Sequence, residues 1–460
     1  MAIATVNPST NELVKSFDEM TPQAVDNAVA TAETEFHHWR TTSYAERSQL
    51  LHRVADLMRK KKTELSRLIT LEMGKLIAES EGEIDLSADI IDYYADKAPE
   101  LLKDQPLDTK LGSAVIRNSP IGVLLGVQPW NFPFYQVARF AAPNVMIGNV
   151  VLVKHASINP QCAIAIETLF REAGAPAGLY TNLLISGSRA SALVTDDRIK
   201  GASLTGSEEA GSHLASAAGK SLKKSVLELG GNDAFIVLED ADIDKTVEWA
   251  YVGSMNNTGQ CCVASKRLIV TEPVADEFTK KFVKRMSGLK VGDPMDKETE
   301  LGPLSSEEAA VNIEGQIQKA VKEGARVLLG GGRIKRKGAF VEATVLTDVK
   351  PNTESFHEEL FGPVAVIYRV KDEKEAIELA NDSHFGLGGC VFTSDIERGK
   401  KVADQIDTGM VFINHPTWTA PDLPFGGVKR SGYGRELSSL GVEEFVNKKL
   451  IRVSDLNDPF

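Results

Sequence analysis

Apolar and polar positions follow two different periods along the chain. Between residues 44 and 79 the apolar residues recur at helical spacing, so one face of the predicted helix carries Leu50, Leu51, Val54, Leu57 and Met58. Continuous apolar runs of strand length come next, which is typical of strands buried on both faces of a sheet. These runs are 121–127, 150–154, 180–186 and 199–206, preceded by a separate strand at 112–118.

Helical patterns separate the apolar runs. One of them spans 161–174 and closes at Gly174, with Pro176 just beyond it. Strands that alternate with helices predict an α/β fold, in which helices cover both faces of a parallel sheet. A second alternating series begins after Glu228, with the expected strands NDAFIVL, RLIVTE, ARVLLGG, VAVIYRV and GCVFTS. Because 460 residues are too many for one core, we expect two α/β domains that meet near residue 228.

One predicted strand, at 443–455, has no neighbour along the chain with which it could pair. A strand with unpaired backbone groups needs the edge of another sheet. We therefore expect this late strand to pair elsewhere, for example in a second subunit.

Composition and charge narrow the function classes. The net charge of −12 argues against nucleic acid as the main partner, and the basic runs at 59–62 and 333–337 are interpreted as solvated faces. No apolar run reaches the roughly 20 residues that cross a bilayer, and the first residues lack the features of a secretion signal. The four cysteines form no disulfide framework, so we expect a reducing, cytoplasmic setting. Without CxxC or HExxH, we expect no metal site.

Two of the four cysteines are adjacent, in the stretch NNTGQCCVASKR at 256–267. Free cysteine is usually a small buried hydrophobe, so this pair could simply fill a core. The alternative is that one of the two is a nucleophile on a catalytic loop.

A glycine turn lies in LTGSEEAGSHLASAAGKSL, at 204–222, where a strand leads through Gly206 and Ser207 into a helix. Such a turn leaves backbone N–H groups and the positive end of a helix dipole free for a pyrophosphate. The glycine spacing is not GxGxxG, so a plain turn is an equal alternative.

Two further stretches place polar groups in apolar surroundings. In QPWNFPFYQVAR, Asn131 lies between two prolines, either in a rigid turn or as an amide donor for developing negative charge. In LELGGND, Glu228 lies in an apolar strand, where a carboxyl group is neutral with a raised pKa or is paired. The first case suits a general base, and the second suits a structural ion pair.

Six motifs occur in one order: PWNFP, LTGS, ELGG, GQCC, EELFGP and LPFGGVKRSGYGRE. Together they resemble the NAD(P)-dependent aldehyde dehydrogenase superfamily over essentially the whole chain, and within it the enzymes that act on succinate semialdehyde. The resemblance implies a Rossmann-like dinucleotide-binding domain (1–107 and 125–227), a second α/β catalytic domain (228–435) and a small β oligomerisation element (108–124 and 436–460).

The resemblance also assigns the chemistry. The family pattern Gly-Gln-x-Cys makes Cys262 the nucleophile and leaves Cys261 with a packing role. Asn131 and the backbone N–H of Cys262 would hold the oxyanion, and Glu228 would activate the water that hydrolyses a thioester on Cys262. The implied reaction is the oxidation of succinate semialdehyde to succinate.

Cofactor contacts are carried over from the same motifs. They are Trp130, Lys154, Gly206, Ser207, Glu359 and Phe361, although a surface lysine capping a strand is the alternative for Lys154. Many NAD-using members have a glutamate where this chain has Ser157, in the run KHAS. Losing that carboxylate removes the repulsion against a 2′-phosphate, so we expect a preference for NADP, with NAD still possible.

The expected substrate contacts include a position at which this sequence differs from the common family pattern. Arg139 stands where many members have an aromatic residue, and Asn131, Tyr135 and Arg139 share one face of a helix. A guanidinium in an apolar tunnel needs an anion, either the substrate carboxylate or an internal salt bridge. Thr419 falls where related enzymes place a hydroxyl against that carboxylate. The common lysine after ELGG is replaced by Asn232, for which we have no physical account.

Alternative functions stay open on the sequence alone. Malonate and glutarate semialdehydes also offer a carboxylate, and aliphatic aldehydes are a further choice. An acylating enzyme would pass the thioester to a thiol or phosphate, but such relatives usually lack the glutamate base. A non-catalytic protein that keeps the fold is the last alternative. We expect a small-molecule semialdehyde substrate, no nucleic-acid or membrane partner, and a homodimer or homotetramer.

Overall fold

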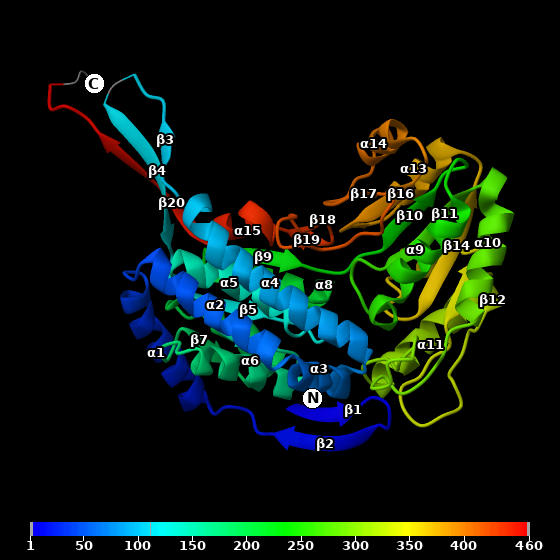
Figure 1. Ribbon diagram of the computed structural model, residues 1–460, viewed down its shortest axis with the longest axis horizontal. Helices are drawn as coiled ribbons and strands as arrows, with labels where there is room; N and C mark the ends of the chain where they lie inside the picture. Colours follow the sequence, from blue (N-terminus) through cyan, green and yellow to red (C-terminus); the bar gives the residue numbers. More distant parts are fainter. Residues whose placement is uncertain (1–2, 111, 458–460) are drawn as a thin grey trace.

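Two large sheets form the body of the protein. The computed structural model describes residues 3–110 and 112–457. One sheet has six strands in the order β19-β9-β8-β5-β6-β7, and the other has seven in the order β12-β13-β14-β11-β10-β16-β17. Figure 1 shows the two sheets side by side, with a three-stranded arm projecting from the first. Parallel strands alternating with helices confirm the predicted α/β class.

The first sheet forms from the apolar runs of the sequence. Its parallel strands are β5 (Val123–Val127), β6 (Val150–Lys154), β7 (Tyr180–Asn182), β8 (Ile199–Thr205) and β9 (Lys224–Glu228). The run expected at 180–186 is shorter than predicted, because the strand ends at Asn182. The connecting helices are α5 (Tyr135–Ile147), α6 (Pro160–Glu172), α7 (Gly187–Leu193) and α8 (Glu208–Lys220).

The helical prediction for residues 44–79 is confirmed, except for short breaks at 61 and 74–76. The chain forms α2 (Tyr44–Lys60), α3 (Lys62–Met73) and the first residues of α4 (Ile77–Leu101), and α1 (Pro22–Trp39) precedes them. Gly74 ends α3 at φ +77°, a left-handed conformation that favours glycine. The predicted apolar face is confirmed, since Leu50, Leu51 and Val54 are buried.

The second sheet repeats the pattern. Its strands are β10 (Asp233–Val237), β11 (Ser265–Thr271), β12 (Arg326–Leu329), β13 (Thr344–Thr347), β14 (Val364–Val370), β16 (Gly389–Phe392) and β17 (Phe412–Ile413). The hydrophobic pattern did not predict the short strand β13. The edge strand β12 pairs antiparallel with β13. The helices are α9 (Ile243–Met255), α10 (Glu272–Ser287), α11 (Glu307–Lys322), α12 (Glu354–His357), α13 (Glu373–Asn381) and α14 (Ile396–Ala403).

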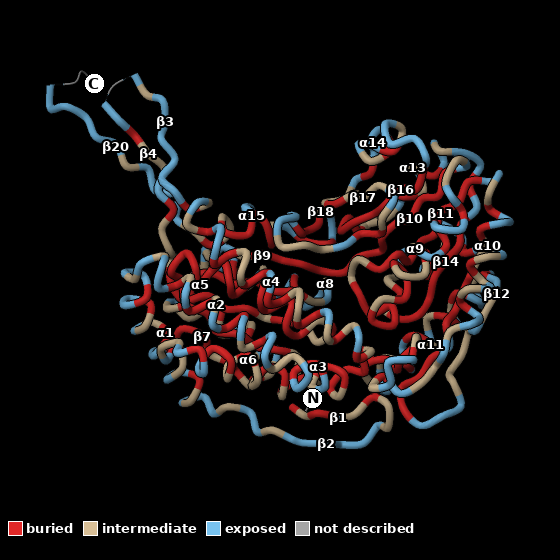
Figure 2. Tube along the Cα trace, viewed as in Figure 1, coloured by how far each residue is buried: buried red, intermediate tan, exposed pale blue. Residues whose placement is uncertain are grey.

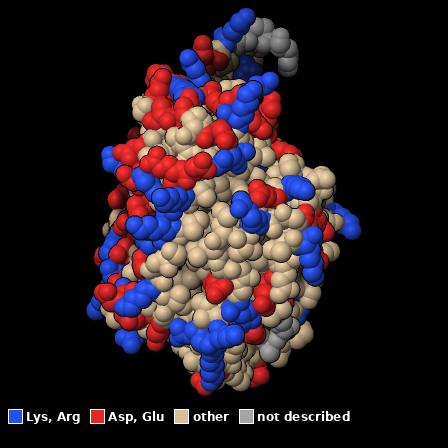
Figure 3. All heavy atoms as spheres, turned by 90° about the vertical axis from the view of Figure 1, so that its right-hand side faces the viewer, with Lys and Arg blue, Asp and Glu red and all other residues tan. Residues whose placement is uncertain are grey.

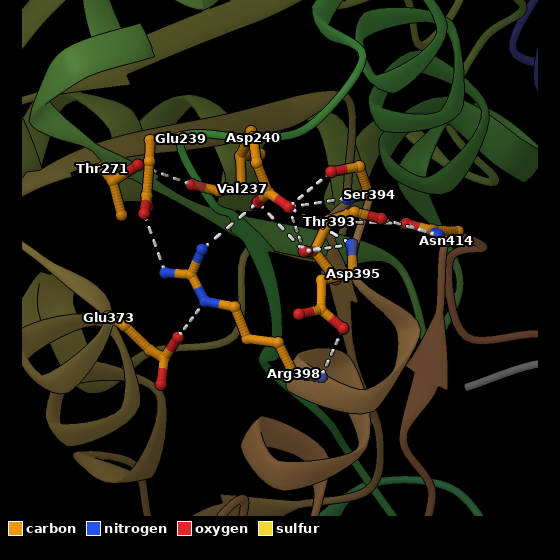
Figure 4. Close-up of polar contacts among 10 residues, drawn as sticks. All are labelled: Val237, Glu239, Asp240, Thr271, Glu373, Thr393, Ser394, Asp395, Arg398 and Asn414. Atoms are coloured by element: carbon orange, nitrogen blue, oxygen red, sulfur yellow. Dashed lines mark hydrogen bonds and ion pairs between the residues drawn. The ribbon is translucent and has the colours of Figure 1, made fainter.

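A polar network fastens the outer helices to this sheet (Figure 4). Arg398, on α14, pairs with Glu373 of α13 and with Glu239, which follows β10. Asp240 accepts hydrogen bonds from the backbone N–H and the hydroxyl of Ser394, at 3.0 and 2.7 Å. These ion pairs and hydrogen bonds hold the start of α14 against the carboxyl end of β10, which is a structural role.

Near its end the chain returns to the first sheet. The short strands β15 (Phe385–Gly386), β18 (Val428–Lys429) and β19 (Gly432–Tyr433) lead back, and Gly432 of β19 pairs with Glu228 of β9. Helix α15 (Ser438–Glu443) follows. The domain boundaries expected from the sequence stay a prediction.

The arm resolves the question of the late strand. β20 (Val446–Val453) pairs antiparallel with β4 (Ser113–Pro120), and β3 (Gln105–Leu107) pairs with the other edge of β4. The sequence left the partner open and suggested another subunit. The structure shows that the partner is the isolated strand of the same chain. Figure 2 shows that most of the arm is exposed.

A hairpin at the start of the chain was not expected. It consists of β1 (Ile3–Asn7) and β2 (Glu12–Phe17). The N–H of Ala4 donates to the carbonyl oxygen of Ser157 at 3.0 Å, which fastens the hairpin to the segment after β6.

The surface mixes charges of both signs. On the face shown in Figure 3, acidic and basic side chains surround an uncharged area, and neither sign dominates. Among the described helices, none is long and apolar enough to cross a membrane.

Candidate active site

The loop before the two cysteines has a strained backbone. A short 3-10 turn (Asn256–Gly259) ends α9, and within it Asn257 and Thr258 have φ of +53° and +55°. A positive φ is costly for a β-branched residue such as threonine, and strain of this kind persists where the surroundings enforce it. Gly259 follows with φ +72°, and a Cβ there would collide with the carbonyl oxygen of Gly362. The loop is therefore pressed against the EELFGP segment.

Gln260 locks this loop from within. Its side-chain carbonyl accepts from the N–H of Ser305 at 2.8 Å, and its side-chain amide donates to the carbonyl oxygen of Asn257 at 3.2 Å. The backbone carbonyl of Gln260 accepts from the side-chain amide of Asn131 at 3.1 Å. The sequence-predicted Asn131 and the cysteine loop are thus directly bonded, although 129 positions separate Asn131 from Gln260.

The amide of Asn131 has a fixed orientation, but the expectation that Asn131 shares a helix face with Tyr135 and Arg139 is wrong, because α5 begins only at Tyr135. Oδ1 of Asn131 accepts from Nε2 of Gln136 at 2.9 Å, so its Nδ2 faces the cysteine loop. One N–H of Nδ2 is engaged with Gln260, and an amide nitrogen carries two. Asn131 can therefore offer a second donor beside Cys262.

Cys262 is half-buried at the wall of a cavity of about 450 Å³. Contact with the thiol of Cys261 and then burial raise the pKa of Cys262 well above its ordinary value. The nearby charge of Arg139 acts in the opposite direction. The resting group is therefore a thiol, and its attack on a substrate requires a proton to leave.

The cavity brings together the predicted substrate residues. Tyr135, Arg139 and Thr419 line it with Cys262. The Tyr135 hydroxyl accepts from Nη1 of Arg139 at 3.0 Å and contacts the Thr419 hydroxyl at 2.9 Å. Burial raises the pKa of Tyr135 to about 12, so it stays a neutral phenol. Most of the remaining lining surface is apolar, but Glu79 and Glu83 of α4 and Glu300 also line the cavity.

Arg139 already has an internal anion. Its guanidinium forms an ion pair with Glu436, and both side chains are almost fully buried, with 1% and 7% exposed. Nη2 also donates to the Thr205 hydroxyl at 3.1 Å. The salt-bridge alternative that the sequence left open is therefore present, while Arg139 also reaches the cavity.

Glu228 ends β9 with a buried carboxyl group. Neither of its carboxyl oxygens has a hydrogen-bond partner in the described part of the chain, and no ion pair there includes it. Burial raises its pKa well above the ordinary value, Arg139 opposes that shift, and Glu436 adds to it. The structural ion pair considered for Glu228 is absent among the described residues. Glu228 is not among the described residues that line the cavity.

The predicted cofactor residues surround the carboxyl ends of β6 and β8. Lys154, at the end of β6, is buried, which lowers its pKa, and it has no ion-pair partner among the described residues. A buried ammonium group without a counter-ion favours the binding of an anion. Ser157 is half-buried three positions later. Ser207 caps α8, its hydroxyl accepting from the Ala210 N–H at 3.3 Å, and Gly206 precedes it.

The remaining predicted cofactor residues are Trp130, Phe361 and Glu359. The rings of Trp130 and Phe361 meet edge to face, with their centroids 5.7 Å apart. Glu359 Oε1 accepts from the N–H of Gly231 at 3.2 Å. A cofactor with an anionic adenosine end and a ribose near Glu359 fits this arrangement. Among the described residues, no group of three or more histidine, cysteine or acidic side chains is arranged to hold a metal ion.

The sequence reasoning missed several residues that touch the site. Gln136 orients Asn131, Glu436 holds Arg139, and Lys266 donates to the carbonyl oxygen of Cys261 at 2.7 Å. The sequence could have indicated Gln136 and Lys266, because each is a polar residue within a helix or strand whose residues are all buried. Glu436 lies inside a motif that was recognised, but its partner comes from another element.

Comparison with known proteins agrees with this geometry. The model of the aldehyde dehydrogenase family matches residues 1–451. A succinate-semialdehyde dehydrogenase [NADP(+)] of Deinococcus radiodurans is 51% identical over 98% of this chain and 94% of its own length. A probable enzyme of the same name from Synechocystis is 45% identical over 99% and 100%.

A solved structure gives the same result in three dimensions. The crystal structure of succinic semialdehyde dehydrogenase from Streptococcus pyogenes, in complex with NADP+ as the cofactor, superposes with a TM-score of 0.97. It is 46% identical, and the match covers 99% of this chain and 100% of that chain. The chain belongs to the aldehyde dehydrogenase family.

Proposed function

We propose that this protein oxidises succinate semialdehyde to succinate and prefers NADP+ as the oxidant. One observation carries the proposal: Cys262 shares a cavity with Tyr135, Arg139 and Thr419, whose polar groups form a continuous chain. The names of the two similar proteins and the NADP+ bound in the Streptococcus pyogenes structure support the same proposal.

The cofactor preference rests on the groups after β6. The unpaired ammonium of Lys154 and the hydroxyl of Ser157 would hold a 2′-phosphate, which a carboxylate at position 157 would repel. Gly206 and Ser207 would face the pyrophosphate from the start of α8. Trp130, Phe361 and Glu359 would hold the nicotinamide half. When bound, the cofactor supplies one piece of chemistry, the acceptance of a hydride from the substrate carbon.

Bond formation begins at Cys262. Its sulfur adds to the aldehyde carbon as its proton passes to solvent water, and the carbonyl oxygen becomes an oxyanion. The free N–H of Asn131 and the backbone N–H of Cys262 donate to this oxygen. Because Gln136 and Gln260 already hold the Asn131 amide, little reorganisation is needed when the charge develops. After oxidation the acyl group remains on Cys262 as a thioester.

Glu228 completes the turnover as a general base. Its carboxylate removes a proton from water, which attacks the thioester and releases the acid and the thiol. A raised pKa suits a base that must take up and release a proton near neutral pH. The unpaired carboxyl group favours this hydrolytic course over acyl transfer to a thiol or phosphate.

The far end of the substrate is recognised by the polar chain in the cavity. In the bond between Tyr135 and Thr419 one hydroxyl donates to the other, so the other hydroxyl would donate to the substrate carboxylate, and the positive charge of Arg139 would stabilise it. Arg139 shares that charge with Glu436, so the two hydroxyls carry part of the selectivity. Malonate and glutarate semialdehydes offer the same carboxylate at other lengths.

A substrate and cofactor panel tests the function. Malonate, succinate and glutarate semialdehydes and uncharged butanal are assayed with NADP+ and with NAD+, and the rate is followed by absorbance. Succinate semialdehyde with NADP+ should give the highest kcat/KM, and Ser157→Glu should shift the preference toward NAD+. Equal or better efficiency with NAD+ in the parent enzyme contradicts the cofactor assignment. Higher efficiency with butanal contradicts the substrate assignment.

We also propose a homodimer or homotetramer, joined through the arm, in a reducing, cytoplasmic setting. The four cysteines are free, and the arm exposes Leu450 and Val453, with 62% and 64% of their surface accessible. An exposed strand edge with apolar side chains favours pairing with another copy. Leu450→Asp should lower the mass measured by light scattering, and an unchanged oligomeric mass contradicts this role of the arm.

A further inference from the structure

Lys266 is a buried cation that the mechanism above does not use. It is the second residue of β11, in which every residue is buried, and only 2% of its side chain is exposed. An ammonium group in such a strand is costly unless polar groups surround it. Its partners therefore indicate why the strand contains a lysine at this position.

The ammonium group of Lys266 bridges two parts of the site. Nζ donates to the backbone carbonyl oxygen of Cys261 at 2.7 Å and to Oε1 of Glu359 at 3.3 Å. The ring of Phe361 lies 5.4 Å from Nζ, within range of a cation–π interaction. One end of the bridge is next to the nucleophile, and the other is the carboxylate proposed to hold the cofactor.

The bridge fixes the direction of the next peptide group. The peptide between Cys261 and Cys262 is trans, so its C=O and its N–H point in opposite directions. Lys266 and the backbone N–H of Ala264, at 3.1 Å, both donate to this C=O, and the Cys262 N–H therefore points away from Lys266. That N–H has no acceptor among the described residues. A cation bonded to the C=O also strengthens the N–H of the same peptide as a donor.

The other end of the bridge holds Glu359. Its Oε1 accepts from both Lys266 and the N–H of Gly231, and 19% of its side chain is exposed. A Cβ at Gly230 would collide with the second carboxyl oxygen, so the backbone encloses the carboxylate closely. Burial raises the pKa of Glu359, and Lys266 opposes this by favouring the ionised form.

We propose that Lys266 is a positioning residue that aims the Cys262 N–H into the oxyanion hole and holds Glu359 in place for the cofactor ribose. This deepens the proposed function, because it assigns a residue that prepares the same site. Lys266 is not among the described residues that line the cavity. It acts through the Cys261 carbonyl and through the Glu359 carboxylate.

The first test separates positioning from folding. Lys266→Met keeps the length and removes the donors, and Lys245→Met, on a lysine that is 82% exposed, is the matched control. Aldehyde oxidation develops an oxyanion, whereas alkylation of Cys262 by iodoacetamide does not. We expect Lys266→Met to lower kcat about tenfold with both succinate semialdehyde and butanal. This is less than the loss of about 10²–10³ that follows complete removal of an oxyanion donor, because the Cys262 N–H is still present. Alkylation in cofactor-free protein should stay within about twofold of the parent.

The second test concerns Glu359. The dissociation constant of NADPH, measured by its fluorescence, should rise in Lys266→Met and in Glu359→Gln. The variant with both changes should bind NADPH as tightly as the single variant with the higher dissociation constant, because either change alone already breaks the pair of Lys266 with Glu359. Lys266→Arg, which keeps the charge and the donors, should recover most of the binding and turnover. If Lys266→Met does not fold, Lys266→Gln takes its place.

The outcomes are distinct from those of the substrate panel, because alkylation and NADPH binding do not depend on which aldehyde is oxidised. Parallel losses of turnover and alkylation would show that Lys266 only supports the fold. Additive losses of NADPH affinity in the double variant would show that Lys266 and Glu359 act independently. Either result overturns the proposal.

Discussion

Arg139 and Glu436 form an ion pair in the interior of the protein, beside the cavity that contains Cys262. Arg139 comes from α5, and Glu436 comes from the segment between β19 and α15. The pair therefore ties the returning end of the chain to the helix that follows Asn131. It also means that the candidate substrate residue has a structural partner.

Breaking this pair should destabilise the protein. Arg139→Met leaves the Glu436 carboxylate buried without its cation, and removing one member of a buried pair costs about 3–5 kcal/mol. The free energy of unfolding in urea should fall by this amount. Arg139→Met with Glu436→Gln should recover part of the loss, because no uncompensated charge remains. A loss below about 1 kcal/mol in the single variant would contradict the pairing.

The same arginine should also distinguish substrates. Arg139→Ala should raise KM strongly for succinate semialdehyde and hardly change KM for butanal, since only the first has a carboxylate. Steady-state kinetics on the folded fraction measure both. If both substrates lose equally, Arg139 is structural, and Tyr135 and Thr419 remain as the carboxylate contacts.

Gln136 should affect the chemical step through Asn131. Gln136→Met removes the donor that holds Asn131 Oδ1, and the amide of Asn131 becomes free to turn. Because losing a whole oxyanion donor costs about 10²–10³ in kcat, loosening one should cost about tenfold, with KM unchanged. The exposed Gln405→Met is the control. In an Asn131→Ala background, Gln136→Met should have no further effect, and a further loss there would rule out this route.

Glu228 should be needed for the second half of the reaction only. In Glu228→Gln the acyl group still forms on Cys262, so a burst of about one NADPH per active site should precede slow turnover. Steady-state turnover should fall by about 10²–10⁴, the usual contribution of a general base. Stopped-flow absorbance measures the burst, and Glu209→Gln, on a carboxylate that is 88% exposed, is the control. A variant without a burst would place Glu228 before acyl formation.

Asp233 should make stability fall as the pH rises. It is buried at the start of β10, accepts from the Gly388 N–H at 3.0 Å, and has a pKa raised by burial to about 6 from 3.8. The folded state therefore binds this proton more tightly than the unfolded state does. Its contribution is fully present below pH 3.8 and is lost as the pH passes 6, in total about 3 kcal/mol.

Asp233→Asn should remove this dependence. The difference in unfolding free energy between the parent and Asp233→Asn, measured in urea from pH 4 to pH 7.5, isolates the one group from all other carboxylates. The parent should lose stability relative to the variant across that range. A constant difference would show that Asp233 stays ionised when buried.

Local pattern was a good guide to most strands of the two sheets, while the catalytic roles of the motif residues stay a prediction. Continuous apolar runs predicted β5, β6 and β8 because a strand buried on both faces needs apolar residues at successive positions. The helical pattern over 44–79 was confirmed, but it did not show where one helix ends and the next begins, because a period of 3.6 continues through a break when both helices bury the same side. Gly74, with its positive φ, marks one such break.

The sequence by itself determined which segments are buried, which residues are chemically able to react, and, through the ordered motifs, that Cys262 rather than Cys261 is the expected nucleophile. Only the tertiary structure decided which polar groups meet. The pairs Arg139 with Glu436, Lys266 with Glu359, and β4 with β20 join segments far apart along the chain. Such contacts depend on the path of the whole backbone, whereas hydrophobic periodicity reports only how each segment faces its own surroundings.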